Sequence, residues 1–167
     1  EPDRKRIVPL AKAFGNKFKG TKAKLIIKSN WTDRGSKNSV NIEKLCEGTQ
    51  CLTLHCENIS TPDLREIYRN SHAALFPSLG EGYGLPHVEL ALMGRPLVVA
   101  DNTSMISLGA HMPDIVKEKC IPVRSNYTPQ LITGDTGNWF ECDMNDFLKK
   151  AATLYKAWWH DPEEYRK

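Results

Sequence analysis

The sequence predicts an α/β fold, a Rossmann-like doubly wound parallel sheet with helices on both faces. Short apolar runs alternate along the chain with longer segments in which apolar residues recur at helical spacing. Short strands that are apolar throughout are typical of parallel sheets buried on both faces. The chain has 167 residues, 40% of them hydrophobic and 26% charged, which is the composition of a globular domain. We therefore expect one domain over residues 1–167.

The helices are predicted from amphipathic spacing together with residues that start or stop a helix. Gly20, Gly48 and Gly94 each follow an amphipathic segment and mark its end. Thr61 can cap a first turn, and Pro62 suits that turn because its missing N–H costs nothing there. The predicted helices cover residues 3–18, 39–46, 61–70, 85–93 and 145–159.

The strands are predicted from the short apolar runs between these helices. They cover residues 23–27, 50–55, 73–76 and 96–100, with a short edge strand at 120–123. The pattern is otherwise weak between residues 101 and 138. Ligands of such sheets bind beyond the carboxyl ends of the strands. The loops after Ile27, His55, Phe76 and Ala100 are therefore the expected places for a site.

Charge and cysteine content narrow the function classes. Lys and Arg number 23 against 20 Asp and Glu, a net charge of +3 that does not predict nucleic-acid binding. No apolar run approaches the roughly 18 residues that span a bilayer. Five scattered cysteines favour reduced thiols and a cytoplasmic setting. Cys46, Cys51, His55 and Cys56 lie close together, but their spacing is not that of structural zinc sites, so no metal is expected.

The densest chemical signal lies between residues 76 and 100, which read as strand, glycine-rich turn, helix and strand. Gly82 and Gly84 allow close backbone approach and positive φ angles. Pro86 fits the first helical turn. Free amide N–H groups near Gly84 and Leu85, together with the helix dipole, predict an anion site, most simply for phosphate.

Two carboxylates flank this predicted site. Glu81 lies in the turn before the helix, where the dipole alone would explain it. Glu89 lies about one turn inside the helix, and its apolar neighbours predict that it has little exposed surface. A partly buried carboxylate needs hydrogen-bond donors, which the two hydroxyls of a ribose would supply. A solvated helix residue is the alternative for Glu89.

Residues 76–100 resemble a known family. The run Pro-Ser-x-x-Glu-Gly-Tyr-Gly-Leu-Pro begins at Pro77, and Gly-Arg-Pro-Leu-Val-Val begins at Gly94. Seven residues separate Glu81 from Glu89. This pattern resembles the E-x7-E signature of retaining GT-B glycosyltransferases, in particular the large family four (group 1 type) of nucleotide-sugar-dependent enzymes. The resemblance rests on glycines, proline, both glutamates and the following strand in fixed register.

The resemblance implies the roles of the site residues. Glu81 would contact sugar hydroxyls or the phosphate region, and Glu89 would hold the ribose. Lys5 resembles the family's phosphate-binding lysine, although Arg6 stands where that family usually has glycine, and a solvated lysine is the alternative. The implied catalytic residues are Glu81 and Lys5, and the implied donor-binding residues are Gly82, Tyr83, Gly84, Leu85 and Glu89.

The resemblance also implies a reaction. GT-B enzymes consist of two Rossmann-like domains, and this chain resembles the C-terminal half, which binds the nucleotide sugar. We expect retaining transfer of a hexosyl group from a UDP- or GDP-hexose, with no metal or cofactor. A glycan, lipid or protein acceptor would bind the N-terminal half, so the isolated domain would be inactive. The resemblance leaves room for peripheral membrane association of the full-length enzyme. The alternatives are a GT-B-like sugar-nucleotide epimerase and a non-catalytic nucleotide-sugar-binding module.

Several further residues are weaker candidates. His87 is expected to pack or to lie on the helix surface rather than to contact phosphate. Asn102 and Thr103 follow a strand and either line a ligand cleft or make a turn. Trp158 and Trp159 are expected to dock a neighbouring domain.

Overall fold

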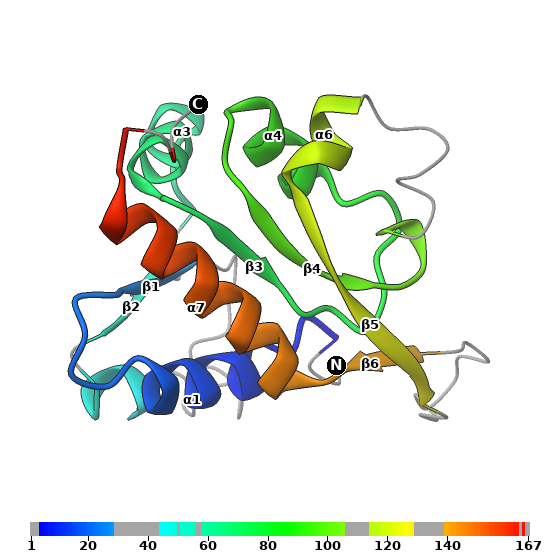
Figure 1. Cartoon of the computed structure of the whole chain (residues 1–167), viewed down its shortest axis with the longest axis horizontal. Helices are drawn as coiled ribbons and strands as arrows, with labels where there is room; N and C mark the ends of the chain where they lie inside the picture. The colour runs from blue at the N-terminus through cyan, green and yellow to red at the C-terminus, as the bar shows by residue number, and fades with distance from the viewer. Residues whose placement is uncertain are drawn as a thin grey trace.

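The computed structural model describes residues 4–28, 44–49, 51–55, 58–105, 114–128, 139–163 and 165. Helices and strands alternate along most of the chain (Figure 1). The helices are α1 (Ile7–Lys17), α3 (Thr61–Asn70), α4 (Leu85–Leu92), α6 (Asp114–Lys119) and α7 (Met144–His160). The strands are β1 (Leu25–Lys28), β2 (Leu52–His55), β3 (Ala74–Phe76), β4 (Leu97–Asp101), β5 (Cys120–Thr128) and β6 (Trp139–Cys142).

The described strands form two sheets. β1 pairs in parallel with β2, with Leu25 opposite Leu52. The second sheet has the order β3-β4-β5-β6, in which β3, β4 and β5 are parallel and β6 is antiparallel to β5. The mixed α/β class with parallel strands is as predicted. The described residues do not join these strands into one doubly wound sheet.

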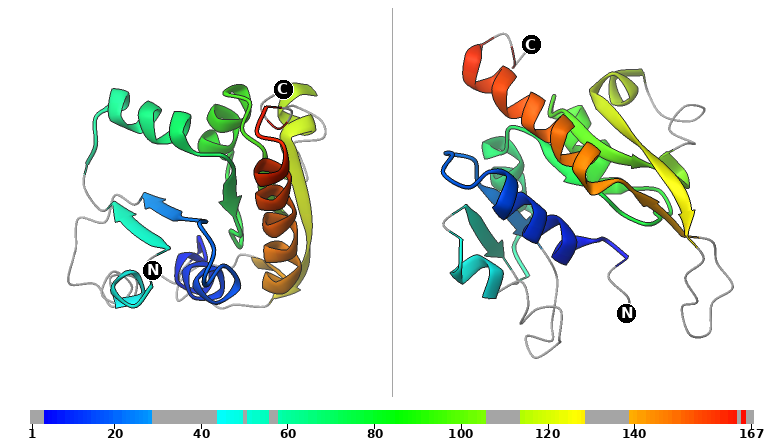
Figure 2. Two further views of the ribbon diagram at one scale, coloured as in Figure 1. Left: turned by 60° about the vertical axis from the view of Figure 1, so that its left-hand side comes forward. Right: turned by 60° about the horizontal axis from the view of Figure 1, so that its bottom comes forward.

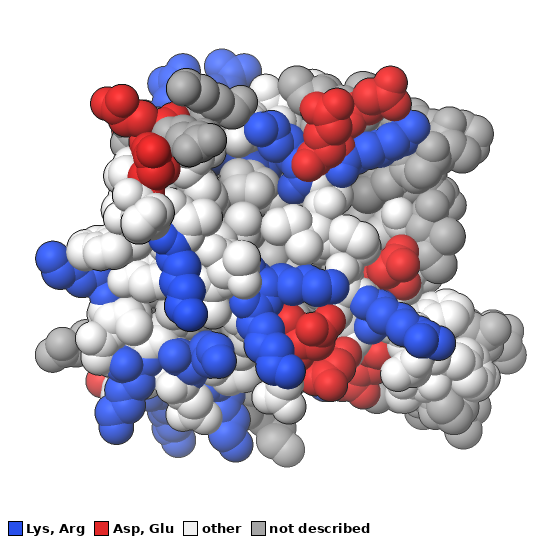
Figure 3. Space-filling model, in the orientation of Figure 1, with Lys and Arg blue, Asp and Glu red and all other residues white. Residues whose placement is uncertain are grey.

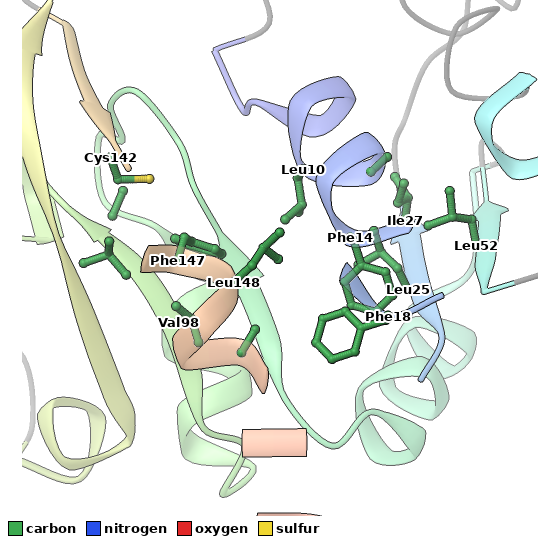
Figure 4. Close-up of a cluster of buried hydrophobic side chains, with 14 residues drawn as sticks. Leu10, Phe14, Phe18, Leu25, Ile27, Leu52, Val98, Cys142, Phe147 and Leu148 are labelled. Atoms are coloured by element: carbon green, nitrogen blue, oxygen red, sulfur yellow. The ribbon is translucent and has the colours of Figure 1, made fainter. Parts of the chain in front are cut away.

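Helices α1 and α7 lie side by side and cover one face of both sheets (Figures 1 and 2). Leu10 and Phe14 of α1, and Phe18 directly after it, belong to the same apolar cluster as Phe147 and Leu148 of α7. The same cluster includes side chains of both sheets (Figure 4): Leu25, Ile27, Leu52, Val98, Ala100 and Val123. One apolar core therefore holds the two sheets together.

Strand β4 is buried on both faces, which explains its continuous apolar sequence. Val98 and Ala100 face the core under α1 and α7. Leu97 and Val99 face a second core, which includes Leu90 and Ala91 of α4 together with Met105. These contacts hold α4 against β4, and they therefore fix the position of the turn that precedes α4.

The predicted helices are mostly found, with shifted ends. α1 begins at Ile7 rather than at residue 3, and α4 and α7 lie within one residue of their predicted bounds. Of the helix predicted at 39–46, residues 44–46 are helical and residues 39–43 lie outside the described residues. The cap predicted at Thr61 is wrong by one residue, because the Ser60 side chain accepts a hydrogen bond from the Asp63 amide and Thr61 is already helical.

The region after residue 101 departs furthest from prediction. The short edge strand expected at 120–123 is the start of β5, which extends to Thr128 and forms a hairpin with β6. Neither β6 nor α6 was predicted. β5 has one buried residue, Val123, and its second half is polar, so it shows neither an apolar run nor a regular alternation. Among the described residues, no helix is long and apolar enough to cross a bilayer.

Candidate functional site

The site lies in the turn between β3 and α4, at the carboxyl end of a parallel strand, as predicted. Gly84 precedes the helix with φ of +78°, a conformation that glycine adopts without strain. A Cβ atom at this position would lie 2.7 Å from Cε of Met105 and 2.8 Å from Nδ1 of His87. Glycine is therefore required here by conformation and by space.

The N-terminus of α4 has no side-chain cap. Among the described residues, no hydrogen-bond acceptor meets the amide N–H groups of Gly82, Tyr83, Gly84 or Leu85. The side chains of Tyr83 and Leu85 are 56% and 61% exposed. Four amides at an uncapped helix start create a positive potential that suits an anion.

Glu81 lies beside this helix start and is held by two cations. Nζ of Lys5 donates to Oε1 of Glu81, and Nη1 of Arg4 lies 3.3 Å from its Oε2. Oγ of Ser78 also donates to Oε1, at 2.7 Å. Burial by itself raises the pKa of Glu81, but these hydrogen bonds and the two positive charges outweigh burial and lower the pKa. Glu81 is therefore ionised at neutral pH, and its carboxylate with the two cations leaves one net positive charge.

A network of polar contacts fixes the backbone of the turn. The amide of Glu81 donates to Oγ1 of Thr103 at 2.9 Å. Nδ2 of Asn102, which is 1% exposed, donates to the carbonyl of Ser78 at 2.9 Å. The Leu79 carbonyl accepts from the amide of Phe140 in β6 at 3.1 Å. We expected Asn102 to line a ligand cleft or to make a turn. In the structure its side chain is buried and joins the loops through hydrogen bonds to the carbonyls of Ser78 and Phe140.

The start of α1 is attached directly to the same turn. The Leu79 amide donates to the Arg4 carbonyl at 2.9 Å, and Nη1 of Arg4 donates to the Gly80 carbonyl at 2.6 Å. Arg6 adopts φ of +55°, in the left-handed region that favours glycine. Its guanidinium pairs with Glu141 of β6, whereas Lys5 points to Glu81. Arg6 therefore adopts a backbone conformation that favours glycine, at the position where the family that the sequence resembles usually has glycine.

Glu89 lies on the side of α4 that faces α3. Glu89 is exposed, so the prediction that it has little exposed surface is wrong. The buried face of α4 consists of His87, Leu90 and Ala91, which places Glu89 outside the core. Oη of Tyr68 donates to Oε2 of Glu89 at 3.2 Å. Burial, the charge of Glu89 and this hydrogen bond raise the pKa of Tyr68 to about 12, so it remains a donor.

His87 is a packing residue, one of the two roles expected for it. It is 1% exposed, and its ring stacks on Phe76 with centroids 3.8 Å apart. Nδ1 donates to the Gly84 carbonyl at 3.2 Å, and Nε2 has no partner among the described residues. Burial lowers the pKa of His87 to about 4, with opposing effects of the Glu81 charge and the hydrogen bond to Gly84. The imidazole is neutral at physiological pH.

The structure thus brings Lys5, Glu81 and the amides of Gly82, Tyr83, Gly84 and Leu85 to one turn, with Glu89 one helical turn away. Sequence reasoning gave no role to Arg4 or Ser78 in this site, or to Tyr68 beside Glu89. Arg4 could have been found as the neighbour of Lys5 in a basic run, whereas Tyr68 carries no local signal. Among the described residues, no three His, Cys, Asp or Glu side chains gather as a metal site, and Cys56 lies outside that part of the chain.

Comparisons with known proteins give a partial match. No family model matches the chain. A stretch of 71 residues is 35% identical to each of three curated Escherichia coli proteins named serotype-specific mannosyltransferase WbdA. This stretch is 39% of the present chain and 8 or 9% of the relatives. The chain therefore spans less than a tenth of the length of the relatives that it matches. The similarity supports a glycosyltransferase in general terms.

The conformation of Gly84 leads to a stability prediction. Gly84→Ala should lower the free energy of unfolding by at least about 1–2 kcal/mol, because the left-handed backbone is unfavourable for alanine and its Cβ would crowd Met105 and His87. Urea unfolding measures the change. Gly82→Ala is the matched control, since a Cβ there meets no described atom within 4 Å and its φ is not positive. Equal stability of the two variants would contradict this account of the turn.

The burial of His87 leads to a pH prediction. Between its ordinary pKa of 6.5 and about 4, the unfolded chain binds a proton that the folded chain does not. The free energy of unfolding should therefore fall as pH falls through this window, by on the order of 3 kcal/mol. His87→Gln should give a shallower slope of stability against pH, whereas the exposed His160→Gln should keep the slope of the parent.

Chemical unfolding at a series of pH values tests this. The lowered pKa of Glu81 also makes stability fall at acid pH, but Glu81 is present in the parent and in His87→Gln alike, so the difference between their slopes reports His87. Identical slopes for the parent chain and His87→Gln would show that His87 does not titrate as its burial requires.

Proposed function

We propose that this chain is the donor-binding part of a glycosyltransferase that uses a nucleoside diphosphate sugar. The observation that carries the proposal is the uncapped N-terminus of α4 with Lys5, Arg4 and Glu81 on one side and Glu89 on the other. Similarity to mannosyltransferases adds independent support. This similarity favours transfer of a sugar over the two alternatives, an epimerase and a non-catalytic module.

The diphosphate of the donor would bind at the start of α4. Its negative charges would accept hydrogen bonds from the four backbone amides of residues 82–85. Lys5 is close enough to the turn to contact Glu81 and would also contact a phosphate placed there. Arg4 supplies a second cation at the same place.

The nucleoside would extend from the phosphates towards Glu89. This carboxylate is accessible, and Tyr68 orients one of its oxygens. The other oxygen can accept from the hydroxyls of a ribose. Glu89 would thus hold the ribose, and the exposed Tyr83 would lie near the same ligand.

The chemical problem of the proposed reaction is the negative charge that develops on the departing diphosphate. Preorganised donors lower this cost most when they are fixed before the reaction. The amides of α4 and the two cations, held by Glu81 and by the Leu79–Arg4 hydrogen bond, are such donors. They support a transfer that needs no metal ion. Glu81 would face the sugar and orient its hydroxyls while configuration is retained.

The sugar, the acceptor and the whole enzyme are further parts of the proposal. The similarity to mannosyltransferases favours a mannosyl donor, with GDP or UDP as the nucleotide. A glycan, lipid or protein acceptor would bind a second, N-terminal domain of a longer cytoplasmic enzyme, so the present 167 residues alone would bind donor without transferring it.

Calorimetric titration of the 167-residue chain with GDP, UDP, GDP-mannose and UDP-glucose tests the site. Glu89→Ala should weaken nucleotide binding about tenfold or more, since a charged hydrogen bond contributes on the order of 1.5–3 kcal/mol. It should leave binding of inorganic pyrophosphate unchanged. Lys5→Met should weaken nucleotide and pyrophosphate alike, because its contact is with phosphate.

The control variants carry the same changes elsewhere on the surface: Glu118→Ala on α6 and Lys12→Met on α1, both exposed in the structure. They should bind as the parent does. Parent-like affinity of Glu89→Ala for every nucleotide would remove Glu89 from the site. A full-length enzyme that binds the sugar nucleotide without transferring the sugar would favour the non-catalytic module, and recovery of an isomerised donor would favour the epimerase.

A further inference from the structure

Positive charge is segregated along this chain. Residues 4–28 contain nine Lys and Arg residues and no Asp or Glu. The whole chain has 23 basic and 20 acidic residues, so the other residues carry 14 basic against 20 acidic. The small net charge of the molecule therefore conceals a strongly basic segment and a net acidic remainder.

The basic segment lies on one exposed face of the fold. Lys12 and Lys17 are exposed on α1, and Lys19 is exposed just after it. Lys22 and Lys24 are exposed in the connection to β1. Figure 3 shows Lys and Arg gathered over α1 and the adjoining part of α7. We refer to this surface, with Lys149 and Lys156 of α7, as the basic face.

An aromatic group lies at the edge of the basic face. Trp159 is 53% exposed, and Nζ of Lys22 lies 5.1 Å from the centroid of its ring. Tyr155, Lys156, Trp159 and His160 line a hollow of about 520 Å³. An exposed indole surrounded by lysines is an arrangement that suits the headgroup region of a bilayer, where Trp and Lys are both favoured.

Acidic side chains are confined to the two ends of α7. Asp143 and Asp146 lie at its start, where Asp143 caps the helix and Asp146 lies 3.4 Å from Lys150. Asp161 and Glu163 follow its end. Residues 4–28 contain no acidic side chain, whereas the exposed Glu47 lies on the helical turn of residues 44–47, close to α1 through the contact of Thr49 with Gly15.

We propose that the basic face docks on an anionic phospholipid surface. Clustered lysines are attracted to the negative potential of such a surface, and Trp159 would enter the headgroup layer. α1 and α7 lie side by side and present a broad helical surface (Figures 1 and 2). Of the aromatic rings at its edge, Trp159 is exposed, whereas Tyr155 and Trp158, whose ring centroids lie 6.2 and 5.8 Å from that of Trp159, are half-buried. These features favour a membrane over a nucleic acid, whose bases stack on successive aromatic platforms in a groove. They also favour it over a neighbouring protein domain, because interface cores are depleted in lysine.

Docking through this face leaves the proposed donor site accessible. The site lies at the first residues of α1 and the start of α4, with Tyr83 and Leu85 exposed, whereas the docking lysines lie on the later part of α1 and beyond it. The inference does not depend on the proposed function, because it rests on charge, exposure and the indole alone.

Sedimentation with vesicles tests the proposal. The chain should bind vesicles of phosphatidylcholine with phosphatidylglycerol, should bind phosphatidylcholine alone much more weakly, and should be released by high salt. The double variant Lys12→Glu and Lys19→Glu should lower the partition coefficient at least about tenfold, because it reverses two charges at the centre of the face. A matched control, Arg65→Glu with Lys117→Glu on α3 and α6, makes the same charge change elsewhere and should bind like the parent. Circular dichroism establishes that each variant is folded.

Tryptophan quenching by brominated lipids provides a second measurement. The parent chain should be quenched on anionic vesicles, and Trp159→Phe should lose most of this quenching. Three outcomes would overturn the proposal: equal binding to neutral and anionic vesicles, equal loss of binding in the control double variant, or binding to duplex DNA or to an acidic polypeptide without binding to vesicles.

Discussion

The contact between Glu81 and the cations at the start of α1 is the interaction on which the candidate site depends. It joins residues more than seventy positions apart and fixes the first turn of α1 against the turn before α4. Without it, Lys5 and Arg4 would be two ordinary surface cations. With it, they lie beside four unbonded amides, and the pKa of Glu81 is lowered so that the group stays charged. The geometry of the candidate anion site thus depends on a pairing internal to the protein.

The fold supports this pairing from two sides. The core under α1 and α7 sets the position of α1, and the second core under α4 sets the position of the glycine-rich turn. β4 contributes to both cores through alternate residues, so a displacement of this strand would shift both α1 and the turn before α4. Asn102 lies directly after β4 and donates a hydrogen bond to the Ser78 carbonyl, which connects the strand to the turn before α4.

Local patterns in the sequence predicted the mixed α/β class, most of the described helices and strands, and the position of the glycine-rich turn between β3 and α4. Apolar spacing and glycine stops located the helices well, and the glycine-rich turn with both glutamates was recognisable because its residues are contiguous. Contacts between distant segments were not accessible in this way. The hairpin of β5 and β6, the donation from Tyr68 to Glu89 and the exposure of Glu89 all depend on how elements pack. The cap at Ser60 was missed because Thr61 is an equally good capping residue and differs by position alone.

The neighbouring residues Lys5 and Arg6, just before α1, pair with acidic residues in two different parts of the molecule. The left-handed backbone of Arg6 sends its side chain to Glu141 of the hairpin, while its neighbour Lys5 serves the turn before α4. The hairpin and the turn before α4, which already share the hydrogen bond from Phe140 to Leu79, are therefore linked a second time through the peptide unit between Lys5 and Arg6. A sequence change in the hairpin can therefore move Lys5 and Arg4 while every residue of the glycine-rich turn stays the same.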